Sequence, residues 1–277
     1  MIDFHVHPDY SIDGSGTIEE YAHRAVELGL TDVCFVPHFD SDPVRGESRM
    51  RLHGQLVPLT SDWMPYYLAD IANAQRRYPG VRLHAGLEVG YAPELESWLS
   101  GILSRSQLDY VIGSVHMVDH LALSIEEEAR EIFRRFSLGE IAQRYFEALG
   151  LAAESGLFDV IGHFDLYKRY GFVTHGAAVL EMHDGLAAPV LGAMARNGVG
   201  IEVNTAVLRH GHPDPYPSRA LLAEARERGV SVVTVGSDAH RVAHLGAELE
   251  RGVAFAHEAG FPVISRFSLR KAEPTSL

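Results

Sequence analysis

The chain opens with Ile2-Asp3-Phe4-His5-Val6-His7, a short apolar run that ends in two histidines. Six further short runs rich in β-branched residues follow, each succeeded by a segment with helical periodicity. This alternation is typical of βα units around a parallel sheet. The predicted strands lie at 2–6, 32–36, 81–89, 110–115, 158–161, 200–203 and 231–235. We therefore expect an α/β protein with a TIM-like (β/α)7 barrel, and residues 262–267 are expected to lie outside the cycle.

Capping and turn residues separate these elements. Thr17-Ile18-Glu19-Glu20 has the pattern of a capping box, and Gly29 is expected to end the helix that it begins. Between residues 38 and 62 the periodicity fails, and prolines and glycines are scattered among polar residues. This pattern predicts a long loop that is placed to cover a site, and whether residues 41–62 act as a lid is left open.

The composition favours one globular domain that acts on a small molecule. Of the 277 residues 46% are hydrophobic, so a single domain over residues 1–277 has ample material for a core. Acidic residues outnumber Lys and Arg by 37 to 24, which disfavours nucleic acid and anionic membranes as partners. Cys34 is the single cysteine, and no leader-like or spanning apolar run is found, so a cytoplasmic location is expected. The oligomeric state, a homo-oligomer included, is left open.

Metal-binding residue types collect at the ends of the predicted strands. The sequence holds 16 histidines, and six of them lie with two carboxylates at strand ends. These eight residues are His5, His7, His38, Glu88, His116, His163, Asp238 and His240. Because the carboxyl ends of barrel strands meet at one face, where barrel enzymes gather their chemistry, the set predicts a metal site there. The other ten histidines (16 − 6 = 10) are assigned to the surface or to packing.

The spacing and the chemistry of these residues support the same hypothesis. In His5-Val6-His7 and Asp238-Ala239-His240 the two ligand types are two residues apart, so on an extended segment they point to one side. A single His-x-His pair is more often a surface or core feature than a site, but seven coincident strand ends are not expected by chance. Imidazole with carboxylate suits Zn, Fe or Mn better than Ca or Mg. We expect two to three divalent transition-metal ions, with Glu88 bridging between them.

In their order along the chain, these motifs resemble the polymerase and histidinol phosphatase (PHP) family of metallophosphoesterases. The resemblance runs from His5 to His240, and it also includes Gly86-Leu87-Glu88, Gly162-His163-Phe164-Asp165 and Ser237-Asp238-Ala239-His240. It implies a distorted barrel of seven βα units, which agrees with the strand count.

The resemblance also implies which residues share each ion. One ion would take His5, His7, Glu88 and Asp238, a second Glu88, His116 and His163, and a third His38, His240 and Asp13. The family often has a histidine in the loop after the first strand, and Asp13 stands in that loop here.

Other residues resemble the histidinol phosphate phosphatase branch of this family. Glu202-Val203-Asn204-Thr205 followed by Arg209 matches it, and Lys168-Arg169 lies where that branch carries a phosphate-binding arginine. The resemblance implies hydrolysis of L-histidinol phosphate in histidine biosynthesis. Ions would activate water, while Arg169 and Arg209, with Lys168 beside them, would bind phosphate. Asp238 or His240 would assist the leaving oxygen.

Three alternatives are weighed beside this function. Another phosphoesterase of the family, acting on a nucleotide or sugar phosphate, would keep every metal ligand and differ only in loops such as 41–62. A DNA-associated exonuclease or polymerase module is disfavoured by the acidic charge. A non-catalytic metal-binding or scaffold protein is disfavoured by the complete set of ligand residues.

Overall fold

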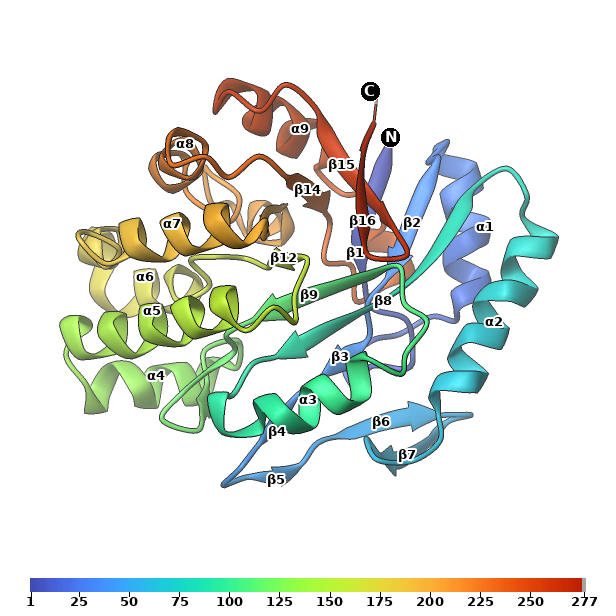
Figure 1. Cartoon of the computed structure of the whole chain (residues 1–277), viewed down its shortest axis with the longest axis horizontal. Helices are drawn as coiled ribbons and strands as arrows, with labels where there is room; N and C mark the ends of the chain where they lie inside the picture. The colour runs from blue at the N-terminus through green and yellow to red at the C-terminus, as the bar shows by residue number, and fades with distance from the viewer. Residues whose placement is uncertain (276–277) are drawn as a thin grey trace.

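Seven parallel strands follow one another around a nearly closed barrel in the computed structural model, which describes residues 1–275 (Figure 1). In spatial order the strands are β1 Ile2–Val6, β2 Asp32–Phe35, β8 Arg82–Gly90, β9 Tyr110–Ser114, β12 Val160–Ile161, β13 Gly200–Asn204 and β14 Val233–Gly236. The ring closes just beyond β14, where the amide of His7 donates to the carbonyl of Ala239 at 2.9 Å. The predicted TIM-like (β/α)7 barrel is confirmed.

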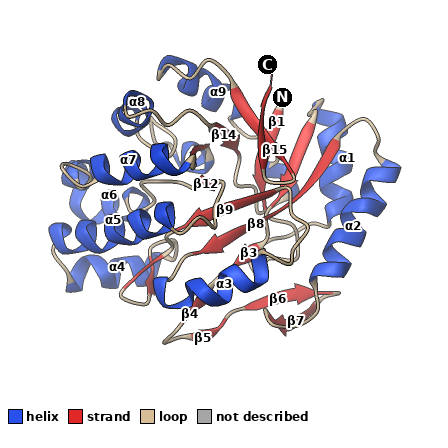
Figure 2. Ribbon diagram, viewed as in Figure 1, coloured by secondary structure: helices blue, strands red, loops and turns tan. Residues whose placement is uncertain are grey.

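Helices cover the outside of the barrel (Figure 2). They are α1 Ile18–Leu28, α2 Met64–Arg77, α3 Glu96–Leu103, α4 Glu126–Arg135, α5 Leu138–Glu154, α6 Lys168–His175, α7 Ala187–Asn197, α8 Arg219–Glu227 and α9 Leu249–Glu258. Short 3-10 helices lie at η1 Pro93–Leu95, η2 Gly176–Glu181, η3 Ala206–His210 and η4 Val242–His244. The capping box at Thr17 and Glu20 begins α1, and Gly29 ends it in the left-handed conformation, as predicted.

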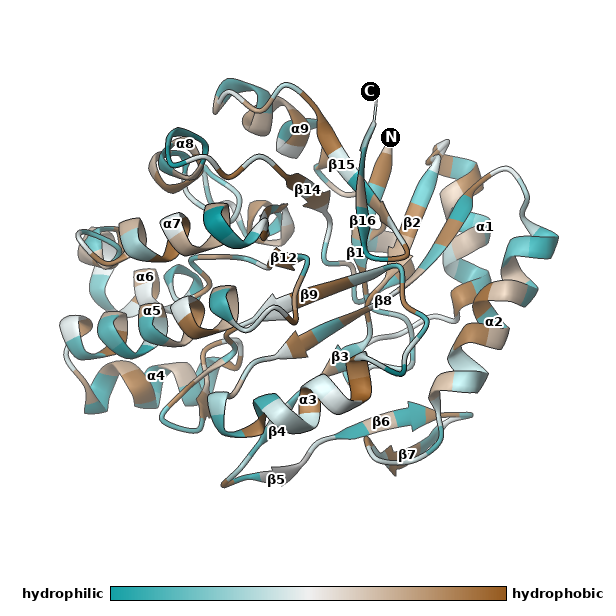
Figure 3. Cartoon of the chain, in the orientation of Figure 1, coloured by the Kyte–Doolittle hydropathy of each residue, from teal (hydrophilic) through white to brown (hydrophobic). Residues whose placement is uncertain are grey.

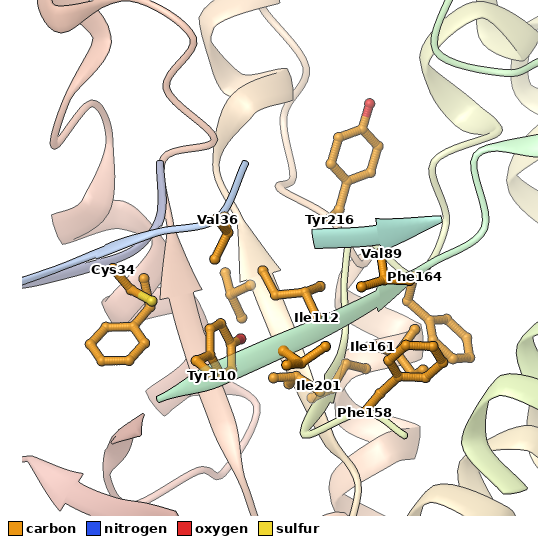
Figure 4. Packing of buried hydrophobic residues seen from close by; sticks show 14 of the residues in the cluster. Cys34, Val36, Val89, Tyr110, Ile112, Phe158, Ile161, Phe164, Ile201 and Tyr216 are labelled. Atoms are coloured by element: carbon orange, nitrogen blue, oxygen red, sulfur yellow. The ribbon is translucent and has the colours of Figure 1, made fainter. Parts of the chain in front are cut away.

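The strands are apolar on both faces because helices cover one face and the barrel interior the other. Figure 3 shows the apolar colour along β9 and β8, while the helices turn hydrophilic residues outward. Inside the core, Ile112, Ile161 and Ile201 pack from three adjacent strands, and Tyr110 lies beside them (Figure 4). The Tyr110 hydroxyl is 3.0 Å from Thr234 Oγ1, so its polar end is satisfied within the core.

The segment predicted as a long loop contains more regular structure than expected. β3 His38–Phe39 pairs with β8, and two antiparallel hairpins follow it: β4 Ser41–Asp42 with β5 Gly46–Glu47, and β6 Arg49–Leu52 with β7 Gln55–Pro58. The turn of the second hairpin has positive φ at His53 and Gly54. The loop prediction was wrong here because strands of two to four residues are too short to show a clear apolar period, even where Arg49-Met50-Arg51-Leu52 alternates.

The amino-terminal end of the barrel is closed by the last hairpin. β15 Ile264–Ser268 and β16 Lys271–Thr275 pair antiparallel, and Phe267 packs on Tyr110 with ring centroids 4.9 Å apart. This confirms that the last apolar segment lies outside the cycle. β10 Met117–Val118 and β11 Leu121–Ala122 form one more short hairpin, after β9.

None of the helices within residues 1–275 is both long enough and apolar enough to cross a membrane. The single-domain prediction over residues 1–277 extends to two residues, 276 and 277, that lie outside the described range.

Candidate metal centre

The first group of ligand residues lies at the ends of β1 and β14. His5 Nε2 and His7 Nε2 face each other at 2.9 Å, as predicted from their spacing. Asp238 Oδ1 is 3.2 Å from His7 Nε2, and Glu88 Oε2 is 3.4 Å from the same nitrogen. Both histidines are fully buried. Two imidazoles and two carboxylates therefore surround one point.

The second group lies on the neighbouring strand ends. His116 Nε2 and His163 Nε2 are 3.4 Å apart, and Glu88 Oε1 is 3.1 Å from the first and 2.7 Å from the second. Ser114 donates a 2.8 Å hydrogen bond to the same carboxylate oxygen. Glu88 thus contacts this histidine pair with Oε1 and the His5–His7 pair with Oε2.

The third group lies nearer the solvent. His38 Nε2 and His240 Nε2 are 3.3 Å apart. Asp13 Oδ2 is 3.6 Å from the first nitrogen and 3.3 Å from the second. The side chain of Asp13 is 54% exposed, whereas the carboxylate of Glu88 is almost wholly buried.

The arrangement of these groups fits divalent cations. Each pair presents two imidazole nitrogens to one point with a carboxylate beside them, and imidazole with carboxylate is the donor set of transition metals. Glu88 Oε2 and His38 Nδ1 lie 2.8 Å apart, and His163 Nδ1 is buried without a hydrogen-bond partner among the described residues. Three sets of ligand atoms lie within 4.8 Å of one another: His5, His7 and Asp238; His38, Glu88 and His116; and His7, His38 and His240. The last set joins His7 to the outer pair.

Two carboxylates bring negative charge to the cluster. Burial opposes the ionised form of Glu88, but the attraction of His116, His5 and His38 holds the pKa of its carboxyl well below the usual range. Asp238 is ionised for the same reason, with His5 as its strongest attraction. Burial and the repulsion of His240 and His38 lower the pKa of His7 to about 3, so its imidazole is neutral and able to bind a metal.

Two of the predicted ligand residues have a strained backbone. Asp238 and His163 have φ values of 52° and 22°, which non-glycine residues seldom adopt. The expectation that Asp238-Ala239-His240 is extended was therefore wrong at Asp238, although both side chains still reach the cluster, with Asp238 Oδ1 3.3 Å from His240 Nδ1. Backbone strain of this kind gathers at functional sites, where the surroundings enforce it.

Two acids beyond the predicted ligands, the buried Glu202 and the partly exposed Asp40, hold the histidines in place. Glu202 Oε1 is 2.6 Å from His5 Nδ1, and its Oε2 accepts the amide of His163 at 3.0 Å. Asp40 Oδ1 is 3.0 Å from His116 Nδ1. A carboxylate on the second nitrogen fixes which imidazole nitrogen faces the metal. Sequence reasoning gave these acids no role, although a glutamate inside the apolar run of β13 was a signal.

Asp3 and Gly236 position the turn that carries Asp238. The carboxylate of Asp3 accepts hydrogen bonds from the amide and hydroxyl of Ser237 at 2.9 and 2.5 Å. A Cβ atom at Gly236 would lie 2.3 Å from His5 Cβ, so only glycine allows β14 to approach β1 this closely.

A cavity of about 770 Å³ opens above the cluster. Its walls include Glu88, His163 and Asp238 of the cluster, together with Arg169 and Arg209. Arg209 donates to the carbonyls of Ser237 and Asp238 at 2.5 and 3.1 Å, whereas Arg169 stacks on the ring of Tyr170. The two arginines therefore bring positive charge to the mouth of an otherwise acidic site.

Lys168 does not lie with the two arginines. It is buried, its ammonium donates to the carbonyl of Pro215 at 2.5 Å, and it pairs with Asp165 at 3.1 Å. Asp165 also accepts the amide of Ser218 at 2.9 Å. The predicted contact between Lys168 and phosphate is corrected: this side chain ties α6 to the segment before α8 and does not line the cavity.

The first hairpin of the 41–62 segment forms one wall of the cavity. Asp42 and Arg45 line it, and both are bound to the segment that follows β9. Asp42 Oδ2 is 2.9 Å from His120 Nδ1, and Arg45 forms two bonds of 2.6 and 3.0 Å to the carboxylate of Glu128. The segment therefore borders the site, as expected, and two pairs fix its position.

A β/α barrel whose carboxyl-terminal mouth gathers imidazoles and carboxylates beneath a cavity lined by two guanidinium groups defines a metal-dependent hydrolase. The model of the PHP domain family matches residues 3–206, and the chain belongs to this family.

Its relatives cover nearly the whole chain. A probable histidinol-phosphatase of Deinococcus radiodurans is 31% identical over 275 residues, which is 99% of each chain. The histidinol-phosphatase of Lactococcus lactis is 23% identical over 98% of this chain and 96% of its own. The crystal structure of the histidinol phosphate phosphatase from Lactococcus lactis, complexed with zinc, L-histidinol and phosphate, superimposes with a TM-score of 0.80. At 21% identity over 98% of both chains, it confirms the fold.

Proposed function

We propose that this chain is a histidinol-phosphatase, a phosphoric monoester hydrolase that converts L-histidinol phosphate and water to L-histidinol and phosphate. The observation that carries the proposal is the cavity in which the cluster around Glu88 faces Arg169 and Arg209. The full-length similarity to a probable histidinol-phosphatase, at 31% identity, supports this particular substrate. The reaction belongs to histidine biosynthesis.

The three histidine pairs are proposed to hold three divalent ions. His5 and His7 with Asp238 and Glu88 would hold the first, His116 and His163 with Glu88 the second, and His38 and His240 with Asp13 the third. When bound, such ions supply Lewis-acid chemistry, lowering the pKa of water and neutralising phosphoryl oxygens. The donor set suits Zn, Fe or Mn, and the Lactococcus lactis structure contains zinc.

Arg169 and Arg209 are proposed to bind the phosphate oxygens that point away from the cluster. Both guanidinium groups line the cavity. A guanidinium binds phosphate with two parallel hydrogen bonds, which fixes the orientation of the group and offsets its charge. Because Arg209 is already bonded to the carbonyls of Ser237 and Asp238, it would also tie the phosphate to the turn that carries a metal ligand.

Asp238 is proposed to accept a proton from the attacking water on its carboxylate and to pass that proton to the leaving oxygen. Its Oδ1 lies 3.2 Å from His7 Nε2, while Oδ2 accepts a 3.2 Å hydrogen bond from Asn204. His240 is less suited, because its Nε2 faces His38 and Asp13 and its Nδ1 faces Asp238. The chain would thus contribute mainly positioning and electrostatic stabilisation to phosphoryl transfer.

The test is phosphate release from a panel of histidinol phosphate, sugar phosphates and nucleotides, before and after removal of metal with EDTA. We expect the highest kcat/KM for histidinol phosphate, loss of activity after EDTA and recovery with Zn²⁺ or Mn²⁺. A higher kcat/KM for a sugar phosphate or nucleotide would assign the chain to another substrate. Full turnover in the metal-free chain would contradict the metal assignment.

A further inference from the structure

The loop of residues 9–14, called loop 9–14 below, carries Asp13 to the outer histidine pair. Asp13 is half exposed, and loop 9–14 lies beyond β1, so no strand ladder holds it. The loop is nevertheless tightly folded: a Cβ atom at Gly14 would lie 2.3 Å from the carbonyl oxygen of Pro8. The position of the Asp13 carboxylate therefore depends on what fixes this backbone.

The side chain of Arg51 fixes it. The guanidinium binds four of the six carbonyls of the loop, and the backbone amide of Arg51 binds a fifth. The distances are 3.3 Å to Asp9, 3.3 Å to Ser11, 3.2 Å to Gly14 and 2.8 Å to Ile12 from the guanidinium, and 2.9 Å to Tyr10 from the amide. A guanidinium carries five donors in a fixed planar fork, and a lysine ammonium cannot reproduce that geometry.

The surroundings show why this contact matters. On one side, Ser11 Oγ accepts the amide of His38 at 3.0 Å and lies 3.3 Å from His7 Nδ1, which joins the loop to two metal-site histidines. On the other side, Asp9 and Arg51 line a second cavity of about 610 Å³, while Tyr10 packs into the core with its ring centroid 5.3 Å from that of Tyr67. Packing therefore anchors the loop at Tyr10, and Arg51 holds the carbonyls on both sides of it.

We propose that Arg51 is a positioning residue for the outer metal position: from β6 it holds loop 9–14 so that Asp13 faces His38 and His240. The inference rests on the proposed function, because it takes the outer pair to bind a cation. It also gives the second hairpin of the 41–62 segment a purpose, since β6 and β7 present Arg51 to the loop.

The experiment compares Arg51→Met, Arg51→Lys and Asp13→Ala with a matched control, Arg77→Met. Arg77 lines the same cavity but pairs with the side chain of Glu19 at 2.6 Å and does not contact loop 9–14. The metal-free protein is titrated with Zn²⁺ by calorimetry, and hydrogen exchange of residues 9–14 is followed by mass spectrometry. Thermal unfolding of each metal-free variant checks that the fold is retained.

We expect three Zn²⁺ equivalents for the unaltered chain. Arg51→Met should weaken the last equivalent by about 10- to 100-fold, the range found for outer-shell partners of metal ligands, and should speed exchange in loop 9–14. Asp13→Ala should weaken the binding of the same equivalent without speeding hydrogen exchange in the loop. The Zn²⁺ affinity and the exchange rate of Arg51→Lys should lie between those of Arg51→Met and the unaltered chain. Both quantities in Arg77→Met should equal those of the unaltered chain.

Two results would overturn the proposal. The first is a Zn²⁺ affinity for the last equivalent that is unchanged in Arg51→Met or Arg51→Lys. The second is that the unaltered chain binds only two equivalents of Zn²⁺. Failure of the proposed function is distinguished by turnover. If the unaltered chain does not hydrolyse histidinol phosphate but Arg51→Met still loses the last equivalent, the substrate assignment fails and the role of Arg51 stands.

Discussion

The two ends of the barrel both bury acids, but they pair them with different bases. At the carboxyl-terminal end, the carboxylate of Glu88 lies 2.7–3.5 Å from nitrogens of five histidines. At the amino-terminal end, Asp32 accepts two 2.7 Å bonds from Arg82 and lies 3.0 Å from His84 Nε2. An arginine remains protonated, so it neutralises the charge of the carboxylate that it pairs with. An imidazole loses its proton readily and can then bind a metal.

The other acids at the two ends of the barrel also differ in what they contact. Below the strands, Asp159 accepts from Arg270 Nε at 2.5 Å, and Asp109 accepts the amide of Leu269 at 3.0 Å, so the last hairpin is bound to the barrel. Above them, the acids face histidines and an open cavity. The lower end therefore serves stability and the upper end serves function, in keeping with the division of labour in β/α barrels.

The largest effect is expected from Glu88→Gln. The neutral amide cannot bridge two cations, so the metal content should fall and kcat/KM for histidinol phosphate should drop about a thousandfold, the equivalent of roughly 4 kcal/mol of transition-state stabilisation. Metal analysis and steady-state kinetics measure this, and the thermal midpoint of the metal-free chain should not decrease. Full metal content with full activity would remove Glu88 from the centre.

Asp32→Asn should show the opposite behaviour. It replaces the buried carboxylate that accepts from the half-exposed Arg82 with an amide, so the free energy of unfolding should fall by about 2 kcal/mol, the contribution of a hydrogen bond to a charged group. Metal content and kcat should be unaltered, because Asp32 lies at the other end of the barrel. Urea unfolding measures the first quantity, and a loss of bound metal would contradict the division between the two ends.

The same pair predicts a pH dependence. Burial would raise the pKa of Asp32, but its bonds to His84 and Arg82 outweigh that and hold the pKa well below the ordinary value. Because the folded pKa is lowered, the stabilisation is complete above about pH 4, the unfolded value, and is lost as the pH falls further. The difference in unfolding free energy between the unaltered chain and Asp32→Asn should be constant from pH 7 to about 5 and should shrink below about pH 4. A difference that grew on acidification would refute this.

Glu202→Gln should have an intermediate effect at the upper end. Its carboxylate holds His5 Nδ1, so the substitution should weaken metal binding by about 10- to 100-fold while the fold is retained. Zn²⁺ titration of the metal-free protein measures this. The control is Glu224→Gln on α8, where the carboxylate pairs with Arg228 at the surface, and equal affinities in the two variants would rule out a positioning role for Glu202.

The smallest effect is expected from Arg169→Met. Removing one guanidinium from the cavity should raise KM about tenfold, since a hydrogen bond to a charged group contributes about 1.5 kcal/mol, and metal content should not change. Arg130→Met on α4, where the arginine pairs with Glu126, serves as the control. An unaltered KM would leave phosphate binding to Arg209 and the ions.

The barrel could be predicted because its signals are local. Apolar β-branched runs and capping residues such as Thr17 identify elements without knowledge of their partners, and strand ends of a parallel barrel meet at one face. Eight of the nine proposed ligands therefore followed from sequence once the strands were placed, and Asp13 followed from the resemblance to the PHP family. The short hairpins were missed because strands of two to four residues are too short to show a clear apolar period. The role of Lys168 was misassigned because the neighbours of a lysine along the chain do not reveal that only 3% of it is exposed.

Sequence by itself determined the class of the protein: which residues become strands, which side chains end them, and which chemistry those side chains support. Only the tertiary structure decided how these side chains are held in position, because contacts such as Glu202 with His5 and Arg51 with loop 9–14 join residues far apart in the chain. It also decided the strained backbone of Asp238 and the separation of Lys168 from Arg169. The physical reason is that local backbone preferences are set by neighbouring residues, whereas the environment of a buried charge is set by whatever the fold brings against it.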